Sequence, residues 1–114
     1  MKNIMNDMIL EGGRARSYSM EAIALARNGR FTRAEEKLEC AVQAINKAHH
    51  LQTSLIQREA AGAKNDVSLL MIHAQDHLMN AMTVKDLALE LVDLYQVTNK
   101  VERKQQHEAV IETK

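Results

Sequence analysis

Proline is absent from the whole 114-residue chain. It is the strongest interruption of an α-helix, because it lacks an amide hydrogen and its ring clashes with the preceding turn. Aromatic residues, which favour β-strands, make up only 3% of the chain, whereas the helix former methionine occurs seven times. The composition therefore predicts an all-α protein, and the length suffices for one domain with one hydrophobic core.

The charge balance narrows the possible partners. The chain has 15 basic and 15 acidic residues, whereas nucleic-acid-binding domains usually carry a basic excess, so we expect no nucleic-acid partner. Residues 1–13 contain Asn6 and Asp7 within their apolar stretch and lack a signal-peptide cleavage site. No apolar run is long enough to span a membrane, and the single Cys40 fits a reducing compartment. These features predict a cytoplasmic protein.

Local signals divide the chain into helices. Gly29 follows a long helical pattern and occupies the position of a C-terminal cap, where a left-handed backbone favours glycine. Thr32 and Glu35 have the spacing of a capping box, in which the two side chains satisfy free amides at the start of a helix. We therefore expect a first helix to end near Asn28 and a second to begin at Thr32.

The second helix shows a continuous packing seam. Its members recur at alternating spacings of four and three residues, as expected for contact with neighbouring helices. They are Ala34, Leu38, Ala41, Ile45, Ala48, Gln52 and Leu55. The seam fades into a predicted loop around Gly62, after which Asn65 or Asp66 can cap a third helix that runs to about Lys100.

Three long helices with short connections predict an antiparallel three-helix bundle of up-down-up topology over residues 1–100. Residues 101–114 are mostly charged and polar, and we interpret them as a tail that is either a frayed helical extension or disordered. Gly12 and Gly13 fall inside the first helix, where each glycine costs about 1 kcal/mol relative to alanine. They indicate either a local break or a close approach by another helix or a phosphate.

A group of polar residues in the third helix occupies an unexpected position. At about 100° per residue, His73, Asp76, His77 and Asn80 fall within an arc of about 100°. The same arc is apolar before and after them along the helix, at Leu69, Leu70, Val84, Leu87, Leu91 and Leu94. A solvated face would stay polar along its whole length, so these four residues are a polar island in an apolar stripe.

The opposite side of this helix is also apolar, with Met71, Met82 and Leu89 at about 180° from His73. A helix that is apolar on two sides is buried on both, and a three-helix bundle covers only one of them. We therefore predict a homo-oligomer with the polar island in or beside the subunit interface. The alternative is that Met71 and Met82 are exposed methionines.

Three chemistries are compatible with the two histidines. His73 and His77 are one turn apart and could chelate zinc as in a metallohydrolase, although the chain lacks the glutamate of the H-E-x-x-H motif. Both could instead be buried structural histidines that hydrogen-bond Asp76. In the third interpretation His73 is a nucleophile, since neutral imidazole can attack a phosphoryl group at physiological pH. Periodicity alone does not decide among them.

Asp76 adds a charge constraint. A carboxylate one turn from a phosphorylated His73 is repulsive, and symmetry-related copies of Asp76 on one axis would increase the repulsion. A hard divalent cation such as Mg²⁺, held by oxygen ligands, would remove it. Protonation of one or more of the copies is the alternative.

Polar residues outside this helix are further candidates. His49 and Gln52 could line the site or orient His73, or they are a boundary histidine and a satisfied glutamine. Arg14 and Arg16 could meet a phosphate or an acidic partner, but surface salt bridges are the simpler interpretation. His50 is expected to face solvent.

The segment Val67–Met82, VSLLMIHAQDHLMNAM, resembles the lactose/cellobiose-specific enzyme IIA family of the bacterial phosphoenolpyruvate-dependent sugar phosphotransferase system. Its most specific part is the uninterrupted HAQDHLM that begins at His73. Supporting matches follow the same order along the chain: GRAR at 13–16 with EA at 21–22, NGRF at 28–31, and AH at 48–49 with QTSLI at 52–56. The resemblance covers about residues 4–97 and leaves out the tail.

The resemblance implies a homotrimer of three-helix bundles that carries phosphate. His73 would accept the group from the histidine-containing phosphocarrier protein as a tele-phosphohistidine. It would then pass the group to a cysteine of the IIB component, which phosphorylates sugar entering through the membrane IIC component. Asp76 would meet its copies on the trimer axis and bind one Mg²⁺ per trimer, and Gln75 and His77 would have supporting roles.

Overall resemblance favours cellobiose or diacetylchitobiose as the sugar. The chain departs from the family at Arg30, where many relatives have an acidic residue, and at Gly12, which precedes the shared glycine. The main alternative function is a non-enzymatic helical adaptor, because residues 28–48 look like a helix-hairpin repeat. Such repeats recur at about 34 residues, and no second copy of the pattern is present.

Overall fold

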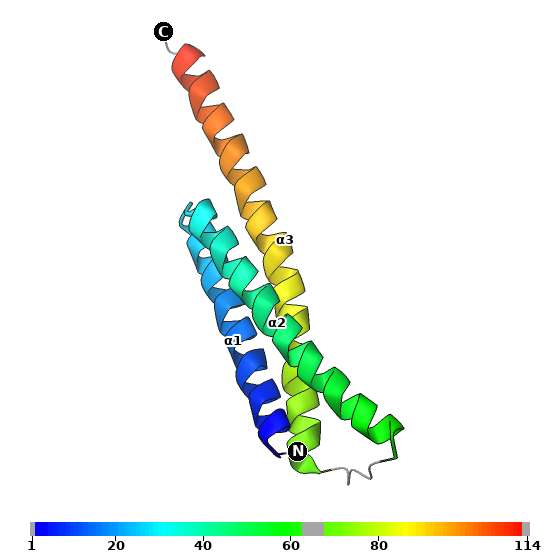
Figure 1. The fold of residues 1–114 in the computed structure, drawn as a ribbon. Coiled ribbons are helices and arrows are strands. Elements are labelled where there is room, and N and C mark those ends of the chain that lie inside the picture. The colour runs from blue at the N-terminus through cyan, green and yellow to red at the C-terminus, as the bar shows by residue number, and fades with distance from the viewer. Residues whose placement is uncertain (1, 63–67, 113–114) are drawn as a thin grey trace.

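The computed structural model describes residues 2–62 and 68–112, with side chains over 3–62 and 68–110. Helices α1 (Lys2–Arg27), α2 (Phe31–Ala60) and α3 (Leu69–Glu112) account for nearly all of these ranges, which contain no strand. The prediction of an all-α protein with three helices is confirmed. The helices lie alongside one another in an elongated body of 76 × 19 × 19 Å (Figure 1). In the described ranges, none of them is long and apolar enough to cross a membrane.

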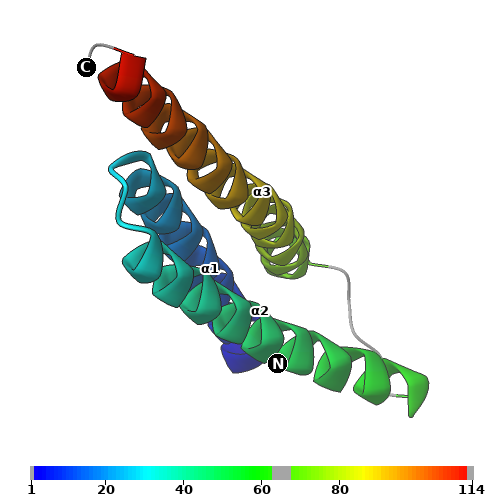
Figure 2. The same ribbon diagram turned by 90° about the horizontal axis from the view of Figure 1, so that it is seen from above.

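Small residues line the contacts between the helices. α1 packs along both of the others, whereas α2 and α3 touch over a shorter length and diverge toward the C-terminal end of α2 (Figures 1 and 2). Every apolar residue of the seam predicted for the second helix is buried. Most of the buried residues are alanines: Ala15, Ala22, Ala26, Ala34, Ala41, Ala44, Ala48, Ala74, Ala81 and Ala88. Larger side chains fill the core mainly at the level of the polar island, where Met8 and Leu78 are fully buried.

Gly29 ends α1 as the sequence predicts. Its φ is +78°, a left-handed conformation that glycine adopts without a steric penalty. The amide of Arg30 donates to the carbonyl of Leu25 at 2.9 Å, and the amide of Gly29 donates to the carbonyl of Ala26 at 3.0 Å. These two bonds form a Schellman motif, which satisfies carbonyls at the end of the helix.

The capping box predicted at Thr32 and Glu35 is wrong. α2 begins at Phe31, its N-cap is Arg30, and no side chain caps it. The first helical bond joins the amide of Ala34 to the carbonyl of Arg30 at 3.0 Å. Phe31 packs against the core cluster at this end of the bundle. With Phe31 partly buried there, the helix starts one residue nearer the N-terminus than predicted, and Thr32 lies inside the first turn.

The N-terminal cap of α3 is Ser68. Its hydroxyl oxygen accepts a bond of 3.1 Å from the amide of Met71, and its carbonyl accepts one of 3.1 Å from Ile72. This is the bonding pattern of a serine cap. The caps predicted at Asn65 or Asp66 lie outside the described residues.

α3 continues beyond the end that the sequence analysis assigned to it. We expected it to stop at about Lys100, but it runs to Glu112. The physical reason is that neither proline nor glycine follows Gly62, so the sequence supplies no helix-terminating signal. Of the two interpretations of the tail, the helical extension is the one observed over residues 101–112, and the side chains of residues 101–110 are exposed.

Gly12 and Gly13 do not interrupt α1, so the predicted local break is wrong. Met5, which precedes the pair, is buried in the same core cluster as Leu78 of α3. A Cβ atom built on Gly12 would lie 3.2 Å from the carbonyl oxygen of His77. The pair therefore marks a close approach of two helices, which was the other interpretation.

Replacing Gly29 by alanine should lower the free energy of unfolding by about 1–2 kcal/mol, because a Cβ atom disfavours the left-handed conformation. Gly29→Asn should cost less, since asparagine visits this region more readily. Urea unfolding followed by far-UV circular dichroism at one fixed protein concentration measures both. Identical midpoints for the wild type and the two variants would contradict the assigned helix end.

Candidate functional site

The outer side of α3 carries the polar island between exposed leucines. We call this surface the His73 face and define it by Leu69, His73, Asp76, Asn80, Leu87, Leu91 and Leu94. His73, Asp76 and Asn80 are all exposed. Leu69 is 83% exposed, and Leu87 and Leu94 are each 58% exposed. An apolar surface of this kind marks an interaction site more often than a solvated side of a monomer.

The residues of α3 that face the bundle lie about 60–140° around the helix from His73 and are Ala74, Leu78, Ala81, Ala88 and Val92. Met71 and Met82 are half-buried and pack against the core clusters. The interpretation of these methionines as exposed residues is therefore wrong. Of the two apolar sides predicted for this helix, the one with the methionines is covered in part, since Leu89 on that side is 40% exposed. The side with His73 is exposed.

His73 and His77 touch each other on the surface of α3. Their ring centroids are 4.4 Å apart and the ring planes meet at 82°, an edge-to-face contact. His77 is half-buried and lines two hollows on the side of α3 that meets α1. Neither ring is hydrogen-bonded to Asp76 in the described part of the chain. Because His73 is exposed, the interpretation of it as a buried structural histidine is wrong.

A metal held by one chain does not fit this arrangement. Among the described residues, no three His, Cys, Asp or Glu side chains come together as a group that could hold a metal ion. A metallohydrolase site of the kind considered for His73 and His77 therefore lacks its third protein ligand. The exposed carboxylate of Asp76 supplies oxygen donors suited to Mg²⁺, which usually binds proteins through one or two carboxylates and keeps several waters.

Gln75 points toward α2. Its Oε1 accepts a hydrogen bond of 2.6 Å from Nε2 of Gln52, and both side chains are half-buried. Gln52 was a candidate for orienting His73, but it is bonded to Gln75, about 200° around the helix from His73. The sequence analysis did not predict this hydrogen bond. The packing seam shows that Gln52 faces a neighbouring helix, but it does not show which residue Gln52 contacts. His49 is half-buried, which fits a boundary residue.

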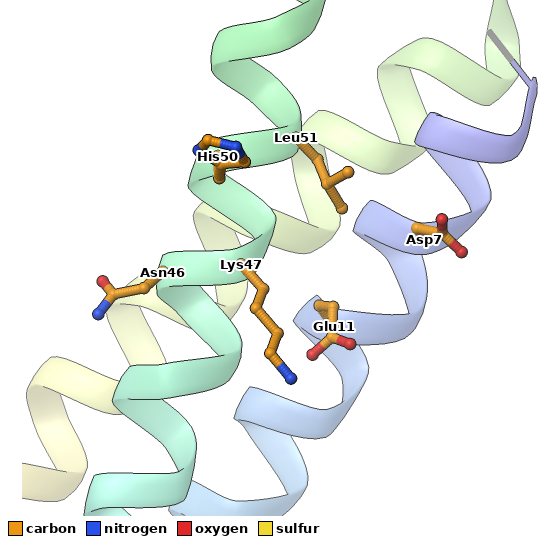
Figure 3. A pocket seen from close by; sticks show the side chains of 6 residues that line it. All are labelled: Asp7, Glu11, Asn46, Lys47, His50 and Leu51. Carbon is orange, nitrogen blue, oxygen red and sulfur yellow. The ribbon is translucent and has the colours of Figure 1, made fainter.

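A hollow of about 660 Å³ lies between α1 and α2 and is separate from the His73 face. It is lined by Asp7, Glu11, Asn46, Lys47, His50 and Leu51, and Lys47 extends toward Glu11 in the close view (Figure 3). His50 is exposed there, as expected. Glu11 pairs with Arg14 at 3.0 Å, so the surface salt bridge predicted for Arg14 is confirmed.

This chain matches known proteins over most of its own length and of theirs. The family described as PTS system, Lactose/Cellobiose specific IIA subunit, matches residues 3–96, a range that includes the polar island and ends before the tail. The chain belongs to this family. The lichenan-specific phosphotransferase enzyme IIA component of Bacillus subtilis is 55% identical over 96 residues, which is 84% of this chain and 87% of that protein. The cellobiose-specific EIIA component of Lactococcus lactis is 43% identical over 101 residues, 89% of this chain and 87% of that protein.

Solved structures of IIA proteins superpose on the bundle. The cellobiose-specific enzyme IIA of Bacillus anthracis has a TM-score of 0.84 at 52% identity and covers 86% of this chain and 90% of its own. The diacetylchitobiose-branch IIA of Escherichia coli, solved in complex with HPr, has a TM-score of 0.75 at 35% identity. It covers 85% of this chain and 94% of its own. These matches identify the chain as a phosphotransferase-system IIA protein with a shared helical fold.

The hydrogen bond between Gln52 and Gln75 should contribute about 1 kcal/mol to stability. A double-mutant cycle with Gln52→Ala, Gln75→Ala and the double variant measures this coupling by urea unfolding. We expect the two single substitutions to be non-additive by this amount, because each removes the same bond. Strict additivity would show that the two side chains do not interact in solution.

Proposed function

We propose that the chain is the phosphocarrier IIA component of a lactose/cellobiose-type sugar phosphotransferase system, with His73 as the residue that carries the phosphoryl group. The main supporting observation is that His73 is an exposed imidazole within the family-matched range, set in an apolar surface. An exposed ring can be reached by two protein partners in turn. A histidine that only stabilised the fold would have no need of such access.

The proposed reaction is transfer between activated side chains. The Nε2 lone pair of His73 attacks the phosphorus atom of a phosphohistidine on the donor protein, and the donor's N–P bond breaks as the new N–P bond forms. In the second transfer a cysteine thiolate of the IIB component attacks the same phosphorus, and the neutral imidazole of His73 leaves. The N–P bonds of the donor and of phosphorylated His73 are both reactive. Positioning of the groups and in-line access to phosphorus therefore account for most of the required catalysis. The edge-to-face contact with His77 supports a role for His77 in holding the ring.

We propose further that the up-down-up bundle assembles as a homotrimer through the His73 face. The exposed leucines on this face, with Leu91 at 38% and Leu87 and Leu94 at 58%, are the apolar area that association would cover. At about 25 cal/mol per Å², covering side chains of this size provides a substantial driving force in each copy. His73 would then lie beside the subunit interface and remain accessible from its edge.

Asp76 is the proposed ligand of one Mg²⁺ per trimer. It lies on the His73 face, so a three-fold axis along this face would bring three carboxylates together. A bound Mg²⁺ would offset the repulsion among these carboxylates and the phosphoryl group on His73. Oxygen donors of this kind fit Mg²⁺ rather than zinc.

The proposed partners follow from the family and from the relatives. The donor is the histidine-containing phosphocarrier protein, supported by the E. coli relative whose structure was solved with HPr. The acceptor is the cognate IIB component, and through it the membrane IIC component, so a cytoplasmic location is proposed. A cellobiose-type sugar is supported by the Lactococcus relative, and diacetylchitobiose by the E. coli relative. Gln75, bonded to Gln52, is proposed to support the site by fixing α3 against α2.

His73→Ala should abolish phosphorylation and leave the oligomer intact, because it removes the nucleophile and only an exposed side chain. The test is incubation with enzyme I, the histidine phosphocarrier and labelled phosphoenolpyruvate, followed by site mapping. His50→Ala is the matched control, since His50 is also exposed but lies off the His73 face. Acid-labile phosphate that persists on His73→Ala would refute the assignment.

Asp76→Leu should give a trimer that binds no metal, because the substitution removes both the ligand and the repulsion that a cation offsets. Native mass spectrometry and elemental analysis after dialysis into Mg²⁺ measure mass and metal together. Asp93→Leu, an exposed acid elsewhere on α3, controls for the loss of one carboxylate per chain. An Asp76→Leu trimer that retains one Mg²⁺ would exclude Asp76 as the ligand, and a monomeric wild type would exclude the trimer.

A further inference from the structure

Gly12 of α1 lies directly against the backbone of α3 at His77. A Cβ atom on Gly12 would be 3.2 Å from the carbonyl oxygen of His77, 3.3 Å from its carbonyl carbon and 3.4 Å from its Cβ. Gly12 is buried, so an added methyl group has nowhere else to go. Even alanine would require His77 or the helix that carries it to move by a few tenths of an ångström.

His77 connects this contact to His73. Its ring meets the ring of His73 edge to face at 4.4 Å between centroids. Because His73 is exposed, its side chain would otherwise sample several staggered rotamers, and the ring contact restricts them. Crowding at the carbonyl group of His77 would displace its backbone. Its ring, and the surface against which His73 rests, would move with the backbone.

We propose that Gly12 is a positioning residue for the phosphoryl-carrying His73 and acts through His77. The absence of a side chain at Gly12 lets α1 pack against the backbone of α3, and it leaves the His77 backbone in the position from which its ring contacts that of His73. The inference rests on the proposed function in one respect only, that His73 is the carrier. The contacts themselves are independent of the reaction.

The neighbouring glycine provides a matched control. A Cβ atom on Gly13 would meet nothing within 4 Å, so Gly13→Ala adds the same methyl group to the same helix without this contact. Both substitutions raise helix propensity equally. Any difference between them therefore reports the contact with His77.

Gly12→Ala should slow phosphoryl transfer from His73 to the IIB component about 3- to 10-fold, since sub-ångström misplacement of a reacting group is costly. The KM for each protein partner should change by less than about twofold, because Gly12 is buried and touches neither partner. Gly13→Ala should stay within about twofold of the wild type in both parameters. Equal rates in the two variants would overturn the proposal.

Two further measurements separate positioning from a general structural effect. In a His77→Ala background, Gly12→Ala should have no additional effect on the transfer rate, because the ring through which Gly12 influences His73 is already absent. An undiminished effect in that background would contradict the proposal. Aromatic ¹H–¹³C spectra of the unphosphorylated protein at fixed pH should show shifted ring resonances for His73 and His77 in Gly12→Ala but not in Gly13→Ala. The exposed His107, near the C-terminal end of α3, serves as the internal reference.

The spectra also keep the two proposals distinguishable. If the wild type is not phosphorylated on His73, the proposed function fails, while the ring resonances still decide whether Gly12 positions the histidine pair. If the wild type is phosphorylated and the resonances of both variants match those of the wild type, the positioning role fails and the function stands.

Discussion

The close packing of α1 against both of its neighbours is the constraint on which the rest of the structure depends. Alanine and glycine at the contact positions let the helices approach, and the fully buried Ala15, Ala22 and Ala74 are examples. Such a core buries little apolar area per residue, while large side chains such as Leu87 and Leu94 remain outside it. This distribution, with small residues inside and large apolar residues outside, leaves an apolar surface of the kind that marks interaction sites.

The same constraint produces the setting of the candidate site. Because the alanine-lined side of α3 is used for the bundle, His73 is directed outward and stays accessible. The close approach at Gly12 occurs at the level of His77, so α1 contacts the backbone of α3 beside the histidine pair. The proposed carrier role needs a nucleophile that is accessible to proteins and yet restricted in its motion. An exposed ring that rests against a half-buried one meets both requirements.

Local chemistry predicted some features and not others. Gly29 was identified as a helix end because the left-handed backbone of a Schellman motif is a local requirement. Thr32 does not cap α2 although its spacing to Glu35 fits the motif, because it lies inside a helix whose first residue, the partly buried Phe31, packs against residues distant in sequence. At the site, periodicity placed His73 on an apolar stripe, but the bond from Gln52 to its partner depends on how two helices are aligned, which periodicity does not specify.

The sequence by itself determined that the chain is helical and approximately where α1 ends and α2 begins. It also determined which polar residues share one arc of α3. The lack of proline, the glycine at the end of α1 and the 3.6-residue period are local properties. They can therefore be recognised in the sequence without knowledge of the tertiary structure. Only the tertiary structure decided which apolar side of α3 faces the bundle and that Gly12 is a contact rather than a break. Periodicity gives angles around a helix axis but no external reference direction. That direction is set by the side on which small residues allow the neighbouring helix to come closest.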